Sequence, residues 1–275
     1  MRAVATPQPA ADSLSSMINL ERYPILDLQS AGARRVIEAA RVQRRESGAC
    51  ELPDFVRPEA IERMIADAIA LTPAAYRSTG VGSAYLEVPD FSLPKDHPRR
   101  VIGPYATGVI AYDQCPPQSP LRQLYEWDVL MRFIEEIVER GTLYRYADPL
   151  GALNVAVMGA GDELQWHFDQ TDFVVSLALQ SAAEGGDFEF APLIRSAQDE
   201  NYDAVGGVLR GERERVGRLP MRPGTLLIFE GRNSIHRVSP IAGDVLRYVA
   251  LLAYDTKPGT TSTELLRLSR YGRNG

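Results

Sequence analysis

The spacing of hydrophobic residues changes near residue 143. Before this point, apolar residues recur every three or four positions, which is the spacing of the buried face of an amphipathic helix. Ile61, Met64, Ile65 and Ala68 form the clearest such face. Pro58 precedes them, and proline suits the first turn of a helix because the N–H it lacks has no partner there. The pattern therefore predicts a helix that begins at Pro58.

Two further helices are predicted in the first half of the chain. Residues 30–45 have apolar positions at helical spacing and end in a basic run, which suits the negative end of a helix dipole. Ser119 and Pro120 are typical of a helix start and open a helix to about residue 139. Between these helices, residues 72–104 are rich in proline, glycine and serine and contain only short strand candidates.

From residue 143 onward, short runs of β-branched and apolar residues alternate with turn-like residues. The runs are residues 143–146, 153–158, 163–168, 173–179, 187–190, 225–229, 234–238 and 246–254. Short strands with this punctuation are typical of an all-β sandwich or barrel, most simply a double-stranded jelly roll. Residues 201–223 are polar, charged and dotted with glycine, which favours an insertion or a long loop.

These patterns predict a mainly β fold with N-terminal helices, in which α-helices flank a double-stranded β-helix (jelly-roll, cupin-like) core. Residues 1–29 are expected to be a largely disordered or extended lead-in. Residues 30–142 are expected to be a helical and loop part packed on the barrel, and residues 143–275 to be the core. A chain of 275 residues can form one such overall domain. The role of the N-terminal half stays open between a lid, a buttress and a homodimer interface.

Composition and charge narrow the class of protein. The net charge of −6 argues against a nucleic-acid binder, which needs a basic field to meet phosphates. The two cysteines, Cys50 and Cys115, are too few for a secreted disulfide framework and are interpreted as reduced structural thiols. No apolar stretch is long enough to cross a bilayer, and the N-terminus is a poor signal peptide. The cytoplasm is the expected location.

Two of the three histidines fall in predicted strands, and one of them lies in a short motif with an aspartate. Residues i and i+2 of a strand project from the same face, so His167 and Asp169 are expected to point together into the barrel. Trp166 and Phe168 would face the other way. His236, on a later strand, completes a set of two imidazoles and one carboxylate.

This set of ligands suits a catalytic metal. Two histidines and one carboxylate on one side of an octahedral metal leave positions open, as non-haem iron(II) oxygenases need for a keto acid and oxygen. A closed zinc site would require four ligands, and no cysteine lies nearby in the sequence. Arg247 begins the strand that follows His236, and its planar guanidinium can bind a carboxylate through two hydrogen bonds. Its expected role is to bind the distal carboxylate of 2-oxoglutarate; an exposed hairpin arginine is the plainer alternative.

The order of motifs is the basis of a family resemblance. Residues 143–259 resemble the iron(II)/2-oxoglutarate-dependent dioxygenases. The resemblance rests on five features in order: His167-x-Asp169, the glycine-rich segment 185–190, the predicted strand 223–229, His236 and Arg247. Within that superfamily the sequences around His167 and His236 look like a bacterial branch of free amino-acid hydroxylases and halogenases. The halogenases have glycine in place of the metal-binding carboxylate. The presence of Asp169 therefore favours hydroxylation.

The resemblance implies cofactors, a substrate class and some less certain contacts. It implies Fe(II), 2-oxoglutarate and O2, with ascorbate as an assay reductant, succinate and CO2 as products, and a small-molecule substrate such as a free amino acid. Asn154 is a candidate for orienting the keto acid, although a plain polar barrel residue fits as well. Arg100 and Trp166 are candidate substrate contacts, against a solvated basic loop and a core indole. His97 is interpreted as a loop histidine.

Three other functions remain open from the sequence. The same site could carry out desaturation or ring closure. A non-catalytic jelly-roll protein could retain the metal ligands, although such a protein has no need of Arg247. A zinc-dependent isomerase or hydrolase would want a third histidine or a clear general base near the metal.

Overall fold

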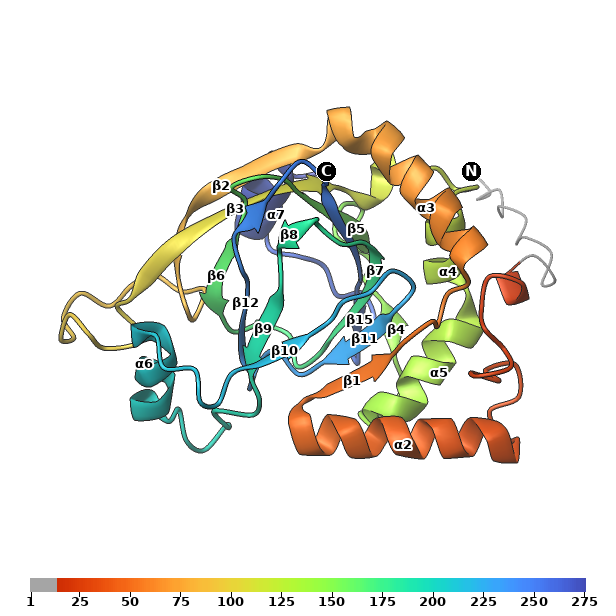
Figure 1. Ribbon diagram of the computed structural model, residues 1–275, viewed down its shortest axis with the longest axis horizontal. Coiled ribbons are helices and arrows are strands. Elements are labelled where there is room, and N and C mark those ends of the chain that lie inside the picture. The colour runs from red at the N-terminus through yellow and green to blue at the C-terminus, as the bar shows by residue number, and fades with distance from the viewer. Residues whose placement is uncertain (1–13) are drawn as a thin grey trace.

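A computed structural model describes residues 14–275 of the chain (Figure 1). The helices longer than one turn are α2 (Ala31–Ser47), α3 (Pro58–Leu71), α4 (Pro120–Glu126), α5 (Asp128–Val138), α6 (Tyr202–Arg210) and α7 (Glu264–Tyr271). The sheet strands are β1 (Ala49–Leu52), β2 (Tyr76–Ser83), β3 (Ile102–Ile110), β5 (Leu153–Met158), β6 (Leu164–His167), β7 (Val174–Gln180), β9 (Phe188–Ala191), β10 (Gly217–Leu219), β11 (Leu226–Phe229), β12 (Ile235–Val238) and β14 (Arg247–Leu252). Two small strand pairs, β4 (Tyr144–Arg145) with β15 (Tyr254–Asp255) and β8 (Glu184–Gly185) with β13 (Ile241–Ala242), lie beside it.

The main sheet is antiparallel and curls into the predicted jelly-roll core. Its strands follow the order β1-β11-β7-β14-β5-β3-β6-β12-β9-β10, and β2 extends it by pairing with β3. Figure 1 shows the strands wrapped around a central space, with α2 to α5 grouped on one side and α7 behind β2 and β3. The eight runs expected from the sequence all contain strands of this core or of the small pairs.

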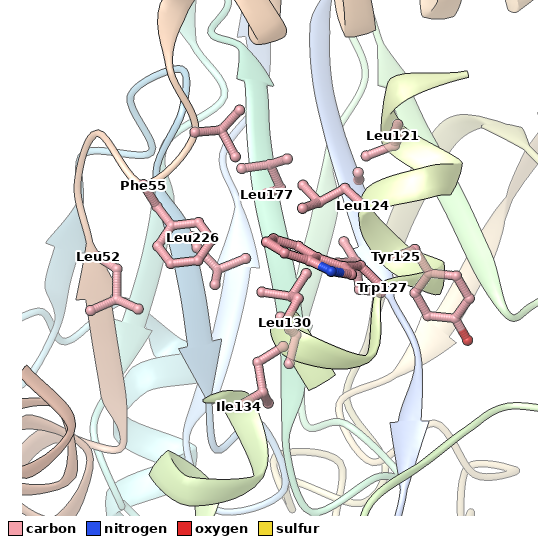
Figure 2. Packing of buried hydrophobic residues seen from close by; sticks show 14 of the residues in the cluster. Leu52, Phe55, Leu121, Leu124, Tyr125, Trp127, Leu130, Ile134, Leu177 and Leu226 are labelled. Carbon is pink, nitrogen blue, oxygen red and sulfur yellow. The ribbon is translucent and has the colours of Figure 1, made fainter. Parts of the chain in front are cut away.

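The helices cover one face of the sheet through a large apolar cluster. Leu124, Leu130 and Ile134 of α4 and α5 are fully buried and point toward Leu177 of β7 and Leu226 of β11 (Figure 2). Side chains of a strand alternate in direction. Leu177 and Leu226 therefore face the helices, and their neighbours along the strands point into the barrel. α4 and α5 therefore pack on this face of the sheet, and the opposite face lines the barrel interior.

Several elements differ from the sequence-based expectation. The helix predicted for residues 119–139 is divided at Trp127 into α4 and α5, where the backbone is extended. The loop expected over residues 201–223 contains α6 and β10. Residues 1–13 lie outside the described residues, but the rest of the expected lead-in is packed. Met17, Ile18, Tyr23 and Ile25 are buried in the main core cluster.

Strands β1, β2 and β3 come from the part of the chain predicted to hold helices, loops and only short strand candidates. β2 and β3 form a long hairpin with eight paired positions. Their glycines signal a loop in the sequence but serve close packing here: a Cβ on Gly80 would lie 2.8 Å from the hydroxyl oxygen of Tyr105. β1 is a four-residue edge strand paired with β11, too short to show a period. The barrel sheet therefore extends into the segment before residue 143.

The C-terminal helix α7 is fixed to the barrel by a buried carboxylate. Asp148 accepts hydrogen bonds from the backbone N–H groups of Leu150, Gly151 and Ser262 and from Nε of Arg267. Burial acts to raise the pKa of Asp148, but these hydrogen bonds together outweigh it and hold the pKa at about 2. The charged form is thus favoured in the folded state.

Asp148→Asn is expected to lower the free energy of unfolding at neutral pH. The fall in pKa from 3.8 to about 2 corresponds to about 2 kcal/mol of stability. Because the folded-state pKa is the lower one, this stabilisation is complete above about pH 4 and is lost as the pH falls toward 2. Urea unfolding of both proteins should show a difference at neutral pH that narrows at about pH 3. An equal difference at both pH values would contradict the assignment.

None of the helices among the described residues combines the length and apolar content that crossing a membrane requires.

Candidate metal site

The three predicted metal ligands meet at one end of two neighbouring strands. His167 ends β6, His236 lies in β12, and the two residues are directly opposite each other in the antiparallel pairing. Asp169 follows two residues after His167, where the backbone N–H of Asp169 donates to the carbonyl oxygen of Gly231 (3.0 Å). In Figure 1, β6 and β12 lie side by side at the wall of the barrel. The structure therefore brings the three residues together, although Asp169 lies just beyond the end of β6 and not within the strand.

The ligand atoms lie at distances that one metal ion can bridge. One ligand atom from each of His167, Asp169 and His236 lies within 4.8 Å of the others. Nε2 of His167 is 3.9 Å from Oδ1 of Asp169, and Nε2 of His236 is 3.6 Å from Oδ2. Among the described residues, no further histidine, cysteine or carboxylate joins this group. The donor set is thus two imidazoles and one carboxylate, which fits a metal with open positions rather than a closed four-ligand zinc site.

Hydrogen bonds orient both imidazole rings. Nδ1 of His167 lies 2.7 Å from the carbonyl oxygen of Gln165, and Nδ1 of His236 lies 3.0 Å from that of Ser234. A ring whose Nδ1–H donates to a carbonyl keeps the lone pair on Nε2, the nitrogen that faces Asp169. Burial, and next the neighbouring His236, lower the pKa of His167 to about 4. His167 is therefore neutral at physiological pH, as a metal ligand must be.

Gly231 lies directly against the aspartate. A Cβ built on Gly231 would be 1.7 Å from Oδ2 of Asp169 and 2.5 Å from its Cγ. Gly231 is buried, and its φ angle is not among the positive ones, so a lack of space and not backbone strain excludes a larger residue. The absence of a side chain at position 231 lets the carboxylate face the two histidines.

Arg247 enters the same interior as an unpaired charge. It lies opposite Met158 in the pairing of β14 with β5, is 5% exposed, and donates from Nη1 to the sulfur of Met158 (3.8 Å). Among the described residues, no carboxylate lies within ion-pair distance of its guanidinium; Asp187, whose charge favours the protonated form, is paired with Arg218. Burial lowers the pKa of Arg247 to about 10, so it stays charged at neutral pH. A buried unpaired guanidinium favours an anionic ligand.

Asn154 lies farther along the interior face of β5. Its side chain is buried, and its Oδ1 accepts a hydrogen bond from Nη2 of Arg270 (3.3 Å). Sequence reasoning missed Arg270, because the resemblance ended at residue 259 and no helix was predicted beyond it. A signal was present: Thr263 caps the N-terminus of α7 and Gly272 ends it in the left-handed conformation, a common pair of helix boundaries.

The two candidate substrate contacts, Arg100 and Trp166, interact with other parts of the protein. Arg100 donates to the carbonyl oxygen of Leu93 (2.7 Å) in the loop between β2 and β3. Trp166 is buried in a second apolar cluster, with Arg213 and Arg237 over its ring. No hydrogen bond or ion pair joins Arg100 or Trp166 to the metal ligands within the part of the chain that the structure describes. His97 lies in a loop, and its ring contacts that of Tyr202 in a tilted arrangement, with the centroids 4.6 Å apart.

Cys50 and Cys115 are free and buried, as predicted. Burial raises the pKa of the Cys115 thiol to about 11 and that of Cys50 to about 12, which keeps both protonated and unreactive.

Comparison with protein families places the chain. The family model described as Halogenase D matches residues 105–265, more than half of the chain. The chain belongs to the Halogenase D family. This membership and the fold confirm the resemblance to the iron(II)/2-oxoglutarate-dependent dioxygenases and to their halogenase-like branch. The match reaches the start of α7, beyond the segment that the sequence motifs covered.

Solved structures share the fold of this Halogenase D family member. The non-heme alpha-ketoglutarate-dependent epimerase SnoN from nogalamycin biosynthesis has a TM-score of 0.56 at 14% identity, over 81% of this chain and 83% of that chain. AviO1 from Streptomyces viridochromogenes Tue57 has a TM-score of 0.55 at 19% identity, over 80% and 95%. The carbocyclase SnoK, also from nogalamycin biosynthesis, has a TM-score of 0.52 at 14% identity, over 79% and 83%. No curated protein matches this chain by sequence.

Proposed function

We propose that this protein is an iron(II)- and 2-oxoglutarate-dependent oxygenase that hydroxylates an unactivated C–H bond of a free amino acid or a similar small molecule. One observation carries the proposal: the ligand set of His167, Asp169 and His236 shares the barrel interior with the buried, unpaired Arg247. A metal-binding protein without catalysis needs the first feature and not the second. Membership of the Halogenase D family and the fold support the same class.

In this proposal the three ligands hold iron(II) through Nε2 of each histidine and the carboxylate of Asp169. With 2-oxoglutarate and O2, the bound iron supplies an oxidant able to take hydrogen from an unactivated C–H bond, and succinate and CO2 are released. Arg247 binds the distal carboxylate of 2-oxoglutarate and so fixes the direction in which the keto acid lies. The structure of SnoN in complex with Fe3+, alpha-ketoglutarate and nogalamycin RO shows that this fold can hold both groups.

The carboxylate of Asp169 decides between hydroxylation and halogenation in this proposal. A halogenase of the resembling branch has glycine at this position, and chloride takes the place of the carboxylate on the metal. Here Oδ1 and Oδ2 of Asp169 already lie close to both histidines. Hydroxylation is therefore the proposed reaction, although the family is named after a halogenase.

A second outcome at the same site is desaturation, ring closure or another rearrangement of the substrate radical. SnoN is an epimerase and SnoK a carbocyclase, so the fold is used for such reactions in those proteins. The proposed ligands and Arg247 serve all of these reactions equally well. The mass of the product distinguishes them.

Aerobic incubation with Fe(II), ascorbate, 2-oxoglutarate and a panel of free amino acids tests the proposal. We expect succinate together with one amino acid that gains a single oxygen atom. Loss of two hydrogens would replace hydroxylation by desaturation or cyclisation. Succinate without any altered amino acid would keep the iron and keto-acid site and reject the substrate class. No succinate from iron-loaded protein would favour the binding-protein alternative.

A further inference from the structure

Arg270 is brought to the barrel by a helix that is anchored at several points. α7 packs beside β2, where Oγ of Ser78 donates to the carbonyl oxygen of Ser269 (2.7 Å). Tyr271 is buried in an apolar cluster with Val109 of β3, and Arg267 is paired with the buried Asp148. These contacts leave the position of Arg270 little freedom. Its guanidinium lies beside Asn154, whose side chain is on the interior face of β5.

The charge of Arg270 has no counter-ion. Its neighbours on the same segment do: Arg267 lies 3.0 Å from Asp148, and Arg273 forms two hydrogen bonds of 2.7 Å to Asp113. Over residues 14–275, no carboxylate lies within ion-pair distance of Arg270, although the chain has an excess of acidic residues. Its guanidinium contacts the amide oxygen of Asn154 and the side chain of Tyr271, both uncharged at neutral pH. The amide nitrogen of Asn154 has no acceptor in this part of the chain either.

Arg270 and Arg247 serve different ends of the interior. Asn154, which contacts Arg270, and Met158, which contacts Arg247, stand at opposite ends of the same face of β5, about 13 Å apart at the usual rise of a strand. Arg270 and Arg247 therefore contact the two ends of one face of β5.

We propose that Arg270, together with the amide of Asn154, is a second carboxylate-binding site of the barrel, separate from Arg247. The inference rests on the proposed function for the identity of the ligand. Two carboxylates meet this description: the keto-acid end of 2-oxoglutarate and the carboxylate of the amino-acid substrate. Both are planar anions that accept paired hydrogen bonds from a guanidinium.

Arg270→Gln and Arg270→Lys test this site, with Arg273→Gln as the matched control. Arg273 is on the same segment and loses a surface ion pair when replaced, without any change at Asn154. The affinity of the anaerobic, Mn(II)-loaded protein for 2-oxoglutarate is measured by calorimetry. The melting temperature of the protein loaded with Mn(II) and 2-oxoglutarate is then followed as an equimolar mixture of the twenty amino acids is added. Neither readout requires turnover.

One of the two affinities should fall about 10- to 100-fold in Arg270→Gln, the loss of a charge-assisted hydrogen-bond pair. A weaker affinity for 2-oxoglutarate would identify the keto-acid end as the ligand of Arg270. An unchanged affinity for 2-oxoglutarate, together with loss of the rise in melting temperature on adding amino acids, would identify the carboxylate of the substrate. Arg270→Lys should lie between, and Arg273→Gln should match the wild type. If both affinities in Arg270→Gln equal those of the control, the inference is overturned. Wild-type protein that binds these carboxylates but forms no succinate would reject the proposed reaction and leave the binding site intact.

Discussion

Replacing Asp169 or His236 with alanine is expected to abolish metal-dependent succinate formation. Each replacement leaves two of three ligands, with the remaining imidazole or carboxylate facing an incomplete set. Metal catalysis contributes several kcal/mol to a reaction, and each 1.36 kcal/mol is a factor of ten in rate. We therefore expect a loss of about 1,000-fold or more in kcat/KM for either variant. His167→Ala should behave in the same way.

The chain offers its own control for this experiment. His97 is the remaining histidine, lies in the loop between β2 and β3, and contacts the ring of Tyr202. His97→Ala removes one imidazole without touching the ligand set, so its affinity for Fe(II) or Mn(II) should equal that of the wild type. Metal affinity and succinate are measured for all four variants. Retention of full turnover by the Asp169 variant would remove this residue from the ligand set.

The metal site could be predicted from the sequence because it follows from local geometry. The two-residue spacing of His167 and Asp169 predicts a shared face, although Asp169 lies just past the end of β6. His236 and Arg247 lie in strands that are apolar enough to recognise. The structure agrees with that interpretation. Arg247 is buried and has no ion-pair partner among the described residues, and His167 and His236 are opposite each other in the pairing of β6 with β12. The jelly-roll core could also be predicted from local signals, because its short apolar strands are separated by turn-like residues.

Features that depend on long-range packing could not be predicted. β2 and β3 are rich in glycine, and the sequence does not show that Gly80 packs against Tyr105 across the strand pair. Residues 14–29 have a composition typical of a lead-in, yet Ile18 and Ile25 fill the core below the helices. Gly231 lies between the runs 225–229 and 234–238, where the sequence indicates only a turn. Its contact with Asp169 joins residues that are 62 positions apart, and no local pattern encodes such a contact.

Gly231→Ala is expected to weaken metal binding, although it adds a single methyl group to a residue that is not one of the predicted metal ligands. The new Cβ would lie 1.7 Å from Oδ2 of Asp169, so the carboxylate must turn away from the histidines or the backbone must move. Loss of a contact that orients a metal ligand typically costs 10- to 100-fold in affinity. Metal titration should therefore show a drop of about 10- to 100-fold, with a matching loss of succinate.

The way in which the clash is relieved can be measured separately from metal binding. Overpacking of a buried site typically costs about 1–3 kcal/mol, and urea unfolding of the metal-free protein measures this cost. Asp169→Gly removes Oδ2, Cγ and Cβ, the three atoms nearest to the new methyl group. In that background Gly231→Ala should cost nothing in stability, so a double-mutant cycle should show a coupling free energy equal to the cost in the wild type. Equal costs in the two backgrounds would mean that position 231 acts through the turn itself. A small cost in the wild type together with weak metal binding would mean that the carboxylate turns away while the backbone stays in place, and that Gly231 is required for the orientation of Asp169 rather than for the fold.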